Sequence, residues 1–306
     1  MRAIPLLKKS FHLYALVRGP EKLDRLRALG VEPLLGDLDD RSSLDRVAGL
    51  ADAVLHLAPP PNMGSRDTRT RNLLSALSQG HGRMRKLPRR LVYISTSGVY
   101  GDCGGGWVSE TSRLKSTSPR SQRREDAERQ IRNWAKRNQV NASILRVPGI
   151  YAADRLPLSR LQQGTPGIIA SEDSYTNHIH ADDLARICVA ALQRGKACRV
   201  YHASDDSRLK MGEYFDKVAD AVGLPRVPRI SRADAQKVLS EMMLSFVNES
   251  RRLTNQRMKR ELKVTLGFPT VADLLATIDR SHSPTPLLLQ NGHKASPKAD
   301  IRRVSK

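Results

Sequence analysis

The feature that most constrains this chain is a regular alternation of short apolar, β-branched runs with amphipathic helical stretches. This order predicts an α/β fold with a doubly wound parallel sheet, because parallel strands need helical crossovers to connect them. The predicted strands are residues 11–17, 31–35, 53–58, 90–95, 142–147 and 199–203. The predicted helices are residues 20–29, 43–50, 66–79, 119–138 and 182–193, the last with Asp182 as its cap.

The beginning of the chain departs from this pattern. A Rossmann-like sheet starts with a strand, a glycine-rich turn and a helix, whereas residues 1–9 already read as the end of that helix. The first strand would then lie upstream of Met1, and its absence would leave two buried strand edges unpaired. We therefore expect that Met1 is not the natural start, or that the chain is a damaged copy. Upstream codons would encode an apolar strand and a GxxGxxG turn.

The pattern loosens after residue 150, which predicts a smaller second lobe. We expect residues 1–150 to form a Rossmann-like nucleotide-binding domain that is completed by about 176–203. Residues 151–175 and 204–280 would form a C-terminal substrate-binding lobe, with helices at 211–222, 232–241, 249–262 and 271–278. The Ser-, Pro-, Lys- and Arg-rich segment 281–306 predicts a disordered basic tail.

The formal net charge of +21 indicates an anionic partner, either nucleic acid or a small molecule. The basic residues are dispersed and aromatic residues make up only 4% of the chain, so nucleic acid is the less favoured partner. No apolar run reaches the roughly 18–20 residues of a membrane span, and the N-terminus does not resemble a signal peptide. The three cysteines form no CxxC pair. The expectation is a cytoplasmic protein without a membrane partner or a metal site.

Four short motifs follow one another at the predicted strand ends. They are residues 36–39 (GDLD), 93–101 (YISTSGVYG), 145–149 (LRVPG) and 178–185 (HIHADDLA). With them the chain resembles the extended short-chain dehydrogenases/reductases, the family of NAD(P)-dependent sugar epimerases and dehydratases. The resemblance spans roughly residues 11–278 and implies a small-molecule substrate and, by analogy alone, a homodimer. It is to an atypical member, because the first strand and glycine-rich loop are missing.

The resemblance places a cofactor along the carboxyl ends of the strands. Asp37 stands where the family uses an aspartate near adenine; the alternative is a turn residue that caps the next helix. Leu57, Ala58 and Pro59 would flank the cofactor. Arg18 stands where NAD-using relatives carry an acid for the ribose 2′-hydroxyl, which favours the 2′-phosphate of NADP over NAD. A merely solvated arginine is the alternative.

The catalytic pattern of the family is broken in this chain. Typical members carry a Ser or Thr at the strand end and a Tyr-x-x-x-Lys on the next helix, where the tyrosinate moves a proton. Thr96 takes the hydroxyl position, but Arg120 and Arg124 take the tyrosine and lysine positions. Arginine exchanges no proton near neutral pH, although Arg124 can still hold ribose or phosphate. Pro148 is the remaining cofactor-binding residue that the resemblance implies.

Other side chains are candidates for the remaining roles. Tyr100 is a second catalytic candidate beside Thr96, and Tyr151 a third; for both the alternative is packing. Arg155 and Arg160 lie in residues 151–164, which would form a lid that chooses the substrate. They would grip an anionic substrate such as a nucleotide sugar or a carboxylate. The alternative is that both arginines are plain surface charges.

Three functions follow from these observations. The first is an NAD(P)-dependent oxidoreductase or epimerase-like enzyme of atypical type, acting on an unidentified carbonyl or sugar-like substrate. The second is a catalytically silent NADP(H)-binding sensor or scaffold, and the third a basic nucleic-acid binder. Arg120 and Arg124 separate the first two, because a silent protein transfers no hydride. Without a glycine loop for the pyrophosphate, cofactor binding by this chain is expected to be weak or lost.

Overall fold

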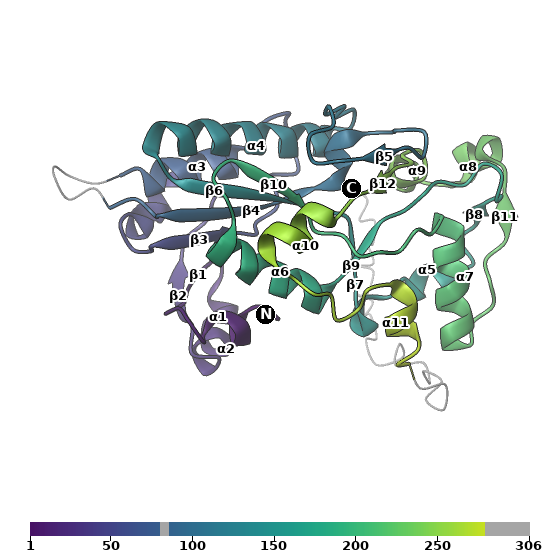
Figure 1. Ribbon diagram of the computed structural model, residues 1–306, viewed down its shortest axis with the longest axis horizontal. Helices are drawn as coiled ribbons and strands as arrows, with labels where there is room; N and C mark the ends of the chain where they lie inside the picture. The colour runs from purple at the N-terminus through teal and green to yellow at the C-terminus, as the bar shows by residue number, and fades with distance from the viewer. Residues whose placement is uncertain (80–85, 279–306) are drawn as a thin grey trace, which may run out of the picture.

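The computed structural model describes residues 1–79 and 86–278 (Figure 1). Its centre is a parallel four-stranded sheet in the order β10-β6-β4-β3. These strands are β3 (Ala53–His56), β4 (Arg90–Thr96), β6 (Asn141–Val147) and β10 (Arg199–His202). Helices α3 (Thr68–Leu77) and α4 (Pro119–Asn138) cover one face, and α6 (Ala181–Arg194) and α10 (Gln256–Leu262) lie on the other. The predicted doubly wound α/β fold is confirmed.

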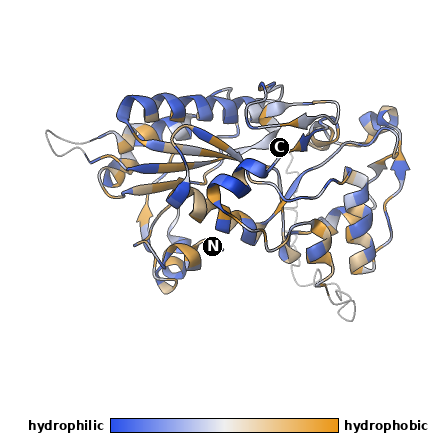
Figure 2. Cartoon of the chain, in the orientation of Figure 1, coloured by the Kyte–Doolittle hydropathy of each residue, from blue (hydrophilic) through white to orange (hydrophobic). Residues whose placement is uncertain are grey.

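Two hydrophobic cores form because successive strand residues point to opposite faces of the sheet. Val92 packs into the core that contains Ile187 of α6. Its neighbour Leu91 packs into the core that contains Ile131 of α4. Figure 2 shows the matching pattern, with apolar residues on the strands and polar residues on the outer side of α4.

Strands β1 (Tyr14–Val17) and β2 (Glu32–Leu35) form a parallel sheet of their own. Short helices α1 (Ile4–Leu7) and α2 (Leu23–Ala28) lie beside them in Figure 1. Within residues 1–79 and 86–278, β1 pairs only with β2, and β3 pairs only with β4. Each of these two strands therefore keeps one edge whose backbone groups have no ladder partner in the described chain.

The unpaired edges predict a difference in amide hydrogen exchange. In β1 and β3, alternate amides that face the unpaired edge should exchange on the order of 100-fold or more faster than amides of β4 and β6, which are paired on both sides. Exchange monitored by NMR, residue by residue, measures this. Equal protection of all amides in the four strands would mean that another segment occupies the edges.

The remaining elements form short strand pairs and helices around the end of the sheet where β4 and β6 finish (Figure 1). The pairs are β7 (Gly149–Tyr151) with β9 (His178–His180), β8 (Gly167–Ile168) with β11 (Arg229–Ile230), and β5 (Trp107–Val108) with β12 (Arg252–Leu253). The helices are α5 (Leu158–Gln162), α7 (Met211–Val222), α8 (Arg232–Val238), α9 (Glu241–Val247) and α11 (Val271–Leu275). The lobe boundaries proposed above remain a prediction.

Two local predictions are wrong. The helix predicted over 249–262 begins only at Gln256, because residues 252–253 pair as a strand with 107–108. Asp182 is not the cap of α6: the Nδ1 atom of His180 accepts the backbone N–H of Asp182 at 3.3 Å, while the Asp182 carboxylate accepts from Arg2 at 2.7 Å. The predicted disordered tail lies outside the described residues.

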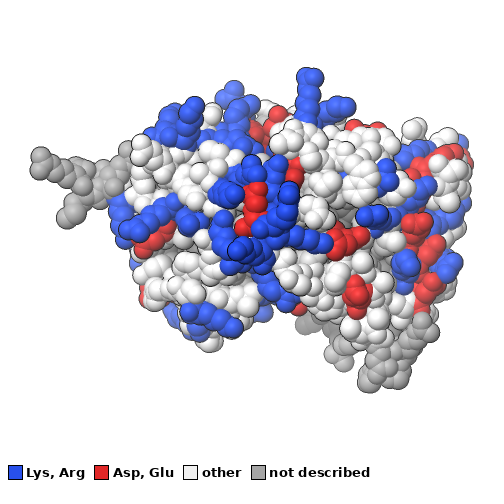
Figure 3. All heavy atoms as spheres, viewed as in Figure 1, with Lys and Arg blue, Asp and Glu red and all other residues white. Residues whose placement is uncertain are grey.

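Lys and Arg side chains are scattered over the face shown in Figure 3, and acidic side chains lie among them. A denser basic group lies near the middle of this face, where Figure 1 places α10 and β10. Among residues 1–79 and 86–278, no helix has the length and apolarity of a membrane span. The same residues contain no cluster of three or more His, Cys, Asp or Glu side chains suited to a metal ion.

Candidate functional site

A pocket of about 300 Å³ lies at the carboxyl ends of β4 and β6. Parallel strands end at this edge, where ligands bind in doubly wound sheets. Its walls come from the ends of the two strands, the first turns of α4, the end of α9 with the chain that follows it, residues 175–177, and Met211 of α7. Among the lining residues are Thr96, Pro148, Arg120, Arg124, Phe246, Glu249 and Arg251.

Thr96 is the last residue of β4 and lines the pocket. Its Oγ1 accepts the backbone N–H of Gly98 at 3.2 Å and caps the 3₁₀ helix of Ser97–Tyr100. A Cβ atom on Gly98 would lie 3.5 Å from that Oγ1 and 4.0 Å from Oε2 of Glu249. Glycine at this position therefore keeps open the space between Thr96 and Glu249.

Arg120 and Arg124, which the resemblance places at the Tyr-Lys positions, line the same pocket. Arg124 donates from NH1 to the carbonyl of Ile94 at 2.7 Å and to the hydroxyl of Tyr93 at 3.1 Å, so its guanidinium is held against the end of β4. The guanidinium of Arg120 lies over the ring of Phe246, 4.6 Å from its centre. Neither group can serve as a proton shuttle at neutral pH.

Glu249 and Arg251 are pocket residues that sequence reasoning missed. Arg251 donates from NH2 to Oε2 of Glu249 at 2.8 Å, and its NH1 donates to the carbonyl of Gly101. Both side chains are largely buried, with exposed fractions of 10% and 15%. They reach the pocket because β12, the next strand, pairs with β5 far away in the sequence.

A second cavity of about 200 Å³ lies at the carboxyl ends of β1, β2 and β3. The predicted cofactor residues Arg18, Asp37, Ala58 and Pro59 all line it. The fifth, Leu57, lies next to them and is 54% exposed, which is unusual for a large apolar side chain at a strand end. The two separate sheets thus contribute to one cavity.

Of the two arginines that line this second cavity, one is paired with a carboxylate and the other is not. Arg69 forms a bidentate pair with Asp39 at 2.8 and 2.6 Å, which ties the loop after β2 to α3. Arg18 is exposed and makes no hydrogen bond or ion pair with another described residue, although its charge acts on the carboxylate of Asp39. Oδ1 of Asp37 accepts the backbone N–H of Asp39 at 2.9 Å, so Asp37 acts at least as a turn residue.

These observations test whether a nicotinamide dinucleotide fits. Arg18 offers free donors for a phosphate at the adenosine end, and Leu57 offers apolar surface for a ligand to cover. Thr96, Arg124 and Pro148 line the pocket at the other end. The residues present therefore suit the two ends of such a cofactor. Its pyrophosphate needs further backbone donors, which helix starts commonly supply.

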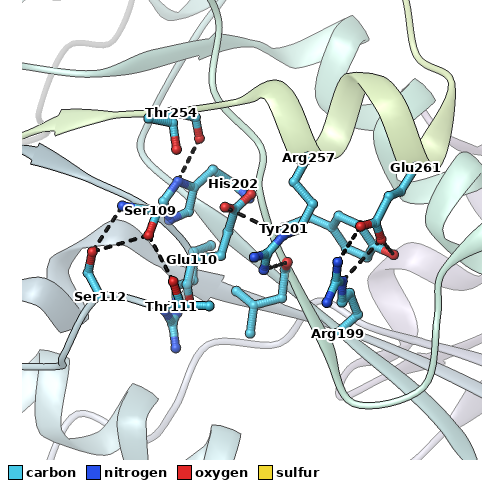
Figure 4. Close-up of polar contacts among 12 residues, drawn as sticks. Ser109, Glu110, Thr111, Ser112, Arg199, Tyr201, His202, Thr254, Arg257 and Glu261 are labelled. Atoms are coloured by element: carbon cyan, nitrogen blue, oxygen red, sulfur yellow. Dashed lines mark hydrogen bonds and ion pairs between the residues drawn. The ribbon is translucent and has the colours of Figure 1, made fainter.

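Tyr100, the second catalytic candidate, is placed away from the pocket. It is fully buried, and its hydroxyl accepts from NH1 of Arg146 at 2.6 Å and contacts Nε2 of His202 at 2.6 Å. Burial raises the pKa of Tyr100 to about 12 and lowers the pKa of His202 to about 3. Nδ1 of His202 donates to the carbonyl of Thr254 at 2.8 Å (Figure 4). This geometry supports a structural role.

The predicted substrate residues also lie outside the pocket. Arg155 is exposed and follows β7 in a short 3₁₀ helix. Arg160 lies over the ring of Phe215 at 4.3 Å and donates to the carbonyl of Pro166 at 3.1 Å. Arg160 is thus held by Phe215 of α7 and by the loop that follows α5. Neither arginine is among the residues lining the pocket, and the predicted grip on substrate stays a prediction.

Comparison with known proteins is decisive for the family. The profile of the NAD dependent epimerase/dehydratase family matches residues 5–203, more than half of the chain. The chain belongs to this family. The resemblance drawn from the four motifs is thereby confirmed.

Individual relatives support the fold. A solved structure of a functionally unknown conserved protein from Silicibacter pomeroyi shares 28% identity at a TM-score of 0.73, covering 90% of this chain and 93% of that chain. The UDP-glucuronic acid 4-epimerase of Bacillus cereus, solved with NAD, shares 18% identity at a TM-score of 0.68, covering 92% and 93%. An uncharacterized protein of Schizosaccharomyces pombe is 24% identical over 232 residues, 72% of this chain and 75% of its own length.

Proposed function

We propose that this protein is an NADP(H)-dependent oxidoreductase or epimerase-like enzyme of atypical type, acting on a small carbonyl or sugar-like substrate. The observation that supports this most is the grouping of predicted residues into two cavities, each at the carboxyl ends of parallel strands. Thr96, Arg124 and Pro148 line the pocket at β4 and β6. Arg18 and Asp37 line the cavity at β1 and β2.

The chain's own residues limit the chemistry of the pocket. A bound nicotinamide supplies or accepts a hydride. The Thr96 hydroxyl can donate to a carbonyl oxygen of substrate, and the arginines can orient the substrate and stabilise negative charge. Arg120 cannot move the proton that the family's tyrosine moves. Glu249 is the one carboxylate among the residues lining the pocket, so it is the group best suited to exchange a proton there.

Arg18 provides the test of cofactor choice. Without a glycine loop both dinucleotides should bind weakly. We nevertheless expect the wild-type chain to bind NADPH more tightly than NADH, because the guanidinium pairs with the 2′-phosphate. Arg18→Glu should weaken NADPH binding by about tenfold or more and leave NADH binding nearly unchanged. Fluorescence titration of both cofactors measures this.

The control for this titration is Arg25→Glu, which makes the same charge change on the exposed side of α2. It should leave both affinities as they are. Equal losses in the two variants would mean that Arg18 acts only through the general positive field. Equal affinity of the wild type for NADPH and NADH would contradict the preference for NADP.

A second candidate function is a catalytically silent NADP(H)-binding sensor or scaffold. Arg120 and Arg124 favour it, since both occupy positions of the family's proton-transfer pair. The two candidates differ in one observable: a sensor binds NADPH but oxidises none of it with any carbonyl substrate offered. A homodimer through α3 and α4 belongs to either proposal, as an analogy with relatives.

A further inference from the structure

Three guanidinium groups meet in the pocket at β4 and β6, against a single carboxylate. Arg120 and Arg124 are four residues apart on α4 and so lie on the same side of that helix. Arg251 comes from the segment after α9, together with its partner Glu249. The lining of the pocket therefore carries more positive than negative charge.

The protein uses these guanidinium groups to different extents. Arg251 is engaged by Glu249 and by the carbonyl of Gly101. Arg124 uses NH1 for its two contacts with β4, and its NH2 and Nε have no partner in the described chain. Arg120 makes no hydrogen bond or ion pair within the described residues, and its guanidinium lies over the ring of Phe246. The guanidinium of Arg120 and the NH2 and Nε atoms of Arg124 are thus N–H donors that no acceptor of the described chain occupies.

The positive charges of the pocket lie close enough to act on one another. Burial lowers the pKa of Arg120, and the neighbouring charges of Arg124 and Arg251 lower it further, against the attraction of Glu249. The group stays charged, because arginine keeps its proton throughout the physiological range. Like charges held together in a partly enclosed space favour the binding of an anion.

We propose that Arg120 and Arg124 form an anion-binding site that holds a carboxylate or phosphate group of the substrate. Calling this anion a part of the substrate rests on the proposed function. Guanidinium groups suit the role, because their fixed pair of N–H donors matches two oxygens of a carboxylate or phosphate. The positions that relatives use for proton transfer thus serve to recognise substrate here.

The test is a titration without cofactor. Inorganic phosphate and, separately, malonate are added at constant ionic strength and followed by calorimetry, which also shows which of the two anion types is preferred. Arg120→Gln should weaken binding by about tenfold or more, and Arg120→Lys by less, since charge-assisted hydrogen bonds are lost. Arg120 has no hydrogen bond to lose within the described chain, only its contact with the ring of Phe246, so its variants should unfold within about 4 °C of the wild type.

Arg155→Gln is the matched control, because Arg155 is an exposed arginine outside the pocket. It should bind both anions as the wild type does. Equal affinities in the wild type and Arg120→Gln, or equal losses in Arg120→Gln and Arg155→Gln, would overturn the anion site. NADPH titration separates this failure from failure of the proposed function: Arg120-dependent anion binding without NADPH binding would contradict only the function.

Discussion

Replacing Arg146 with methionine is expected to lower the free energy of unfolding by about 3–5 kcal/mol. Arg146 and Glu128 form a bidentate pair at 3.0 and 2.7 Å, and their side chains are only 3% and 2% exposed. The variant leaves the Glu128 carboxylate buried with the hydroxyl of Ser95 at 2.7 Å and the more distant Arg132 at 3.7 Å. It also removes the hydrogen bond that Arg146 donates to the hydroxyl of Tyr100. Urea denaturation measures the loss.

The physical reason for this loss can be checked with a second variant. If the cost comes from an unpaired buried charge, Arg146→Met combined with Glu128→Leu should recover part of the stability, because apolar replacements of a buried pair are often tolerated. Arg155→Met removes an exposed arginine and should change stability by no more than about 0.5 kcal/mol. A double variant less stable than Arg146→Met alone would contradict the explanation.

Local sequence signals sufficed where they coincide with tertiary packing. The helix predicted over Pro119–Asn138 has these ends in the structure, where Ser118 caps its start and Gln139 takes a left-handed conformation after its end. The helix over Met211–Val222 ends before Gly223, which has a φ of 70°. The strands of the central sheet were likewise found within a few residues, since runs buried on both faces are apolar throughout.

Long-range contacts were the part that the sequence concealed. Glu249 and Arg251 belong to the pocket only because a two-residue strand, β12, pairs with β5 about 145 positions earlier in the chain. The helical periodicity of residues 249–262 pointed to one continuous helix instead. For the same reason the sequence suggested Arg155 and Arg160 as substrate ligands. Their positions along the chain indicated the lobe to which they belong, but not that both lie outside the lining of the pocket.

Replacing Asp205 with asparagine is expected to stabilise the protein at pH 8 by as much as roughly 4 kcal/mol. Asp205 is 3% exposed, and burial raises its pKa to about 7. Its Oδ1 accepts the backbone N–H of Ser207 at 2.9 Å, a bond that the asparagine oxygen keeps. Oδ2 makes no hydrogen bond of ordinary geometry within the described chain, although the Tyr151 hydroxyl is near. Asparagine thus removes a poorly compensated buried charge.

The pH dependence of this gain has a definite sign. The folded state holds the Asp205 proton more tightly than the unfolded state does, so the native carboxylate lowers stability as the pH rises from about 4 to about 7. Below that window both states are protonated, and the variant should match the wild type. Above it the full difference should appear in urea denaturation. Asp24→Asn, at a side chain that is 97% exposed, should show no such rise. The variant and the wild type could instead differ by the same amount at pH 4 and at pH 8. That result would mean that groups other than its own proton neutralise the buried carboxylate.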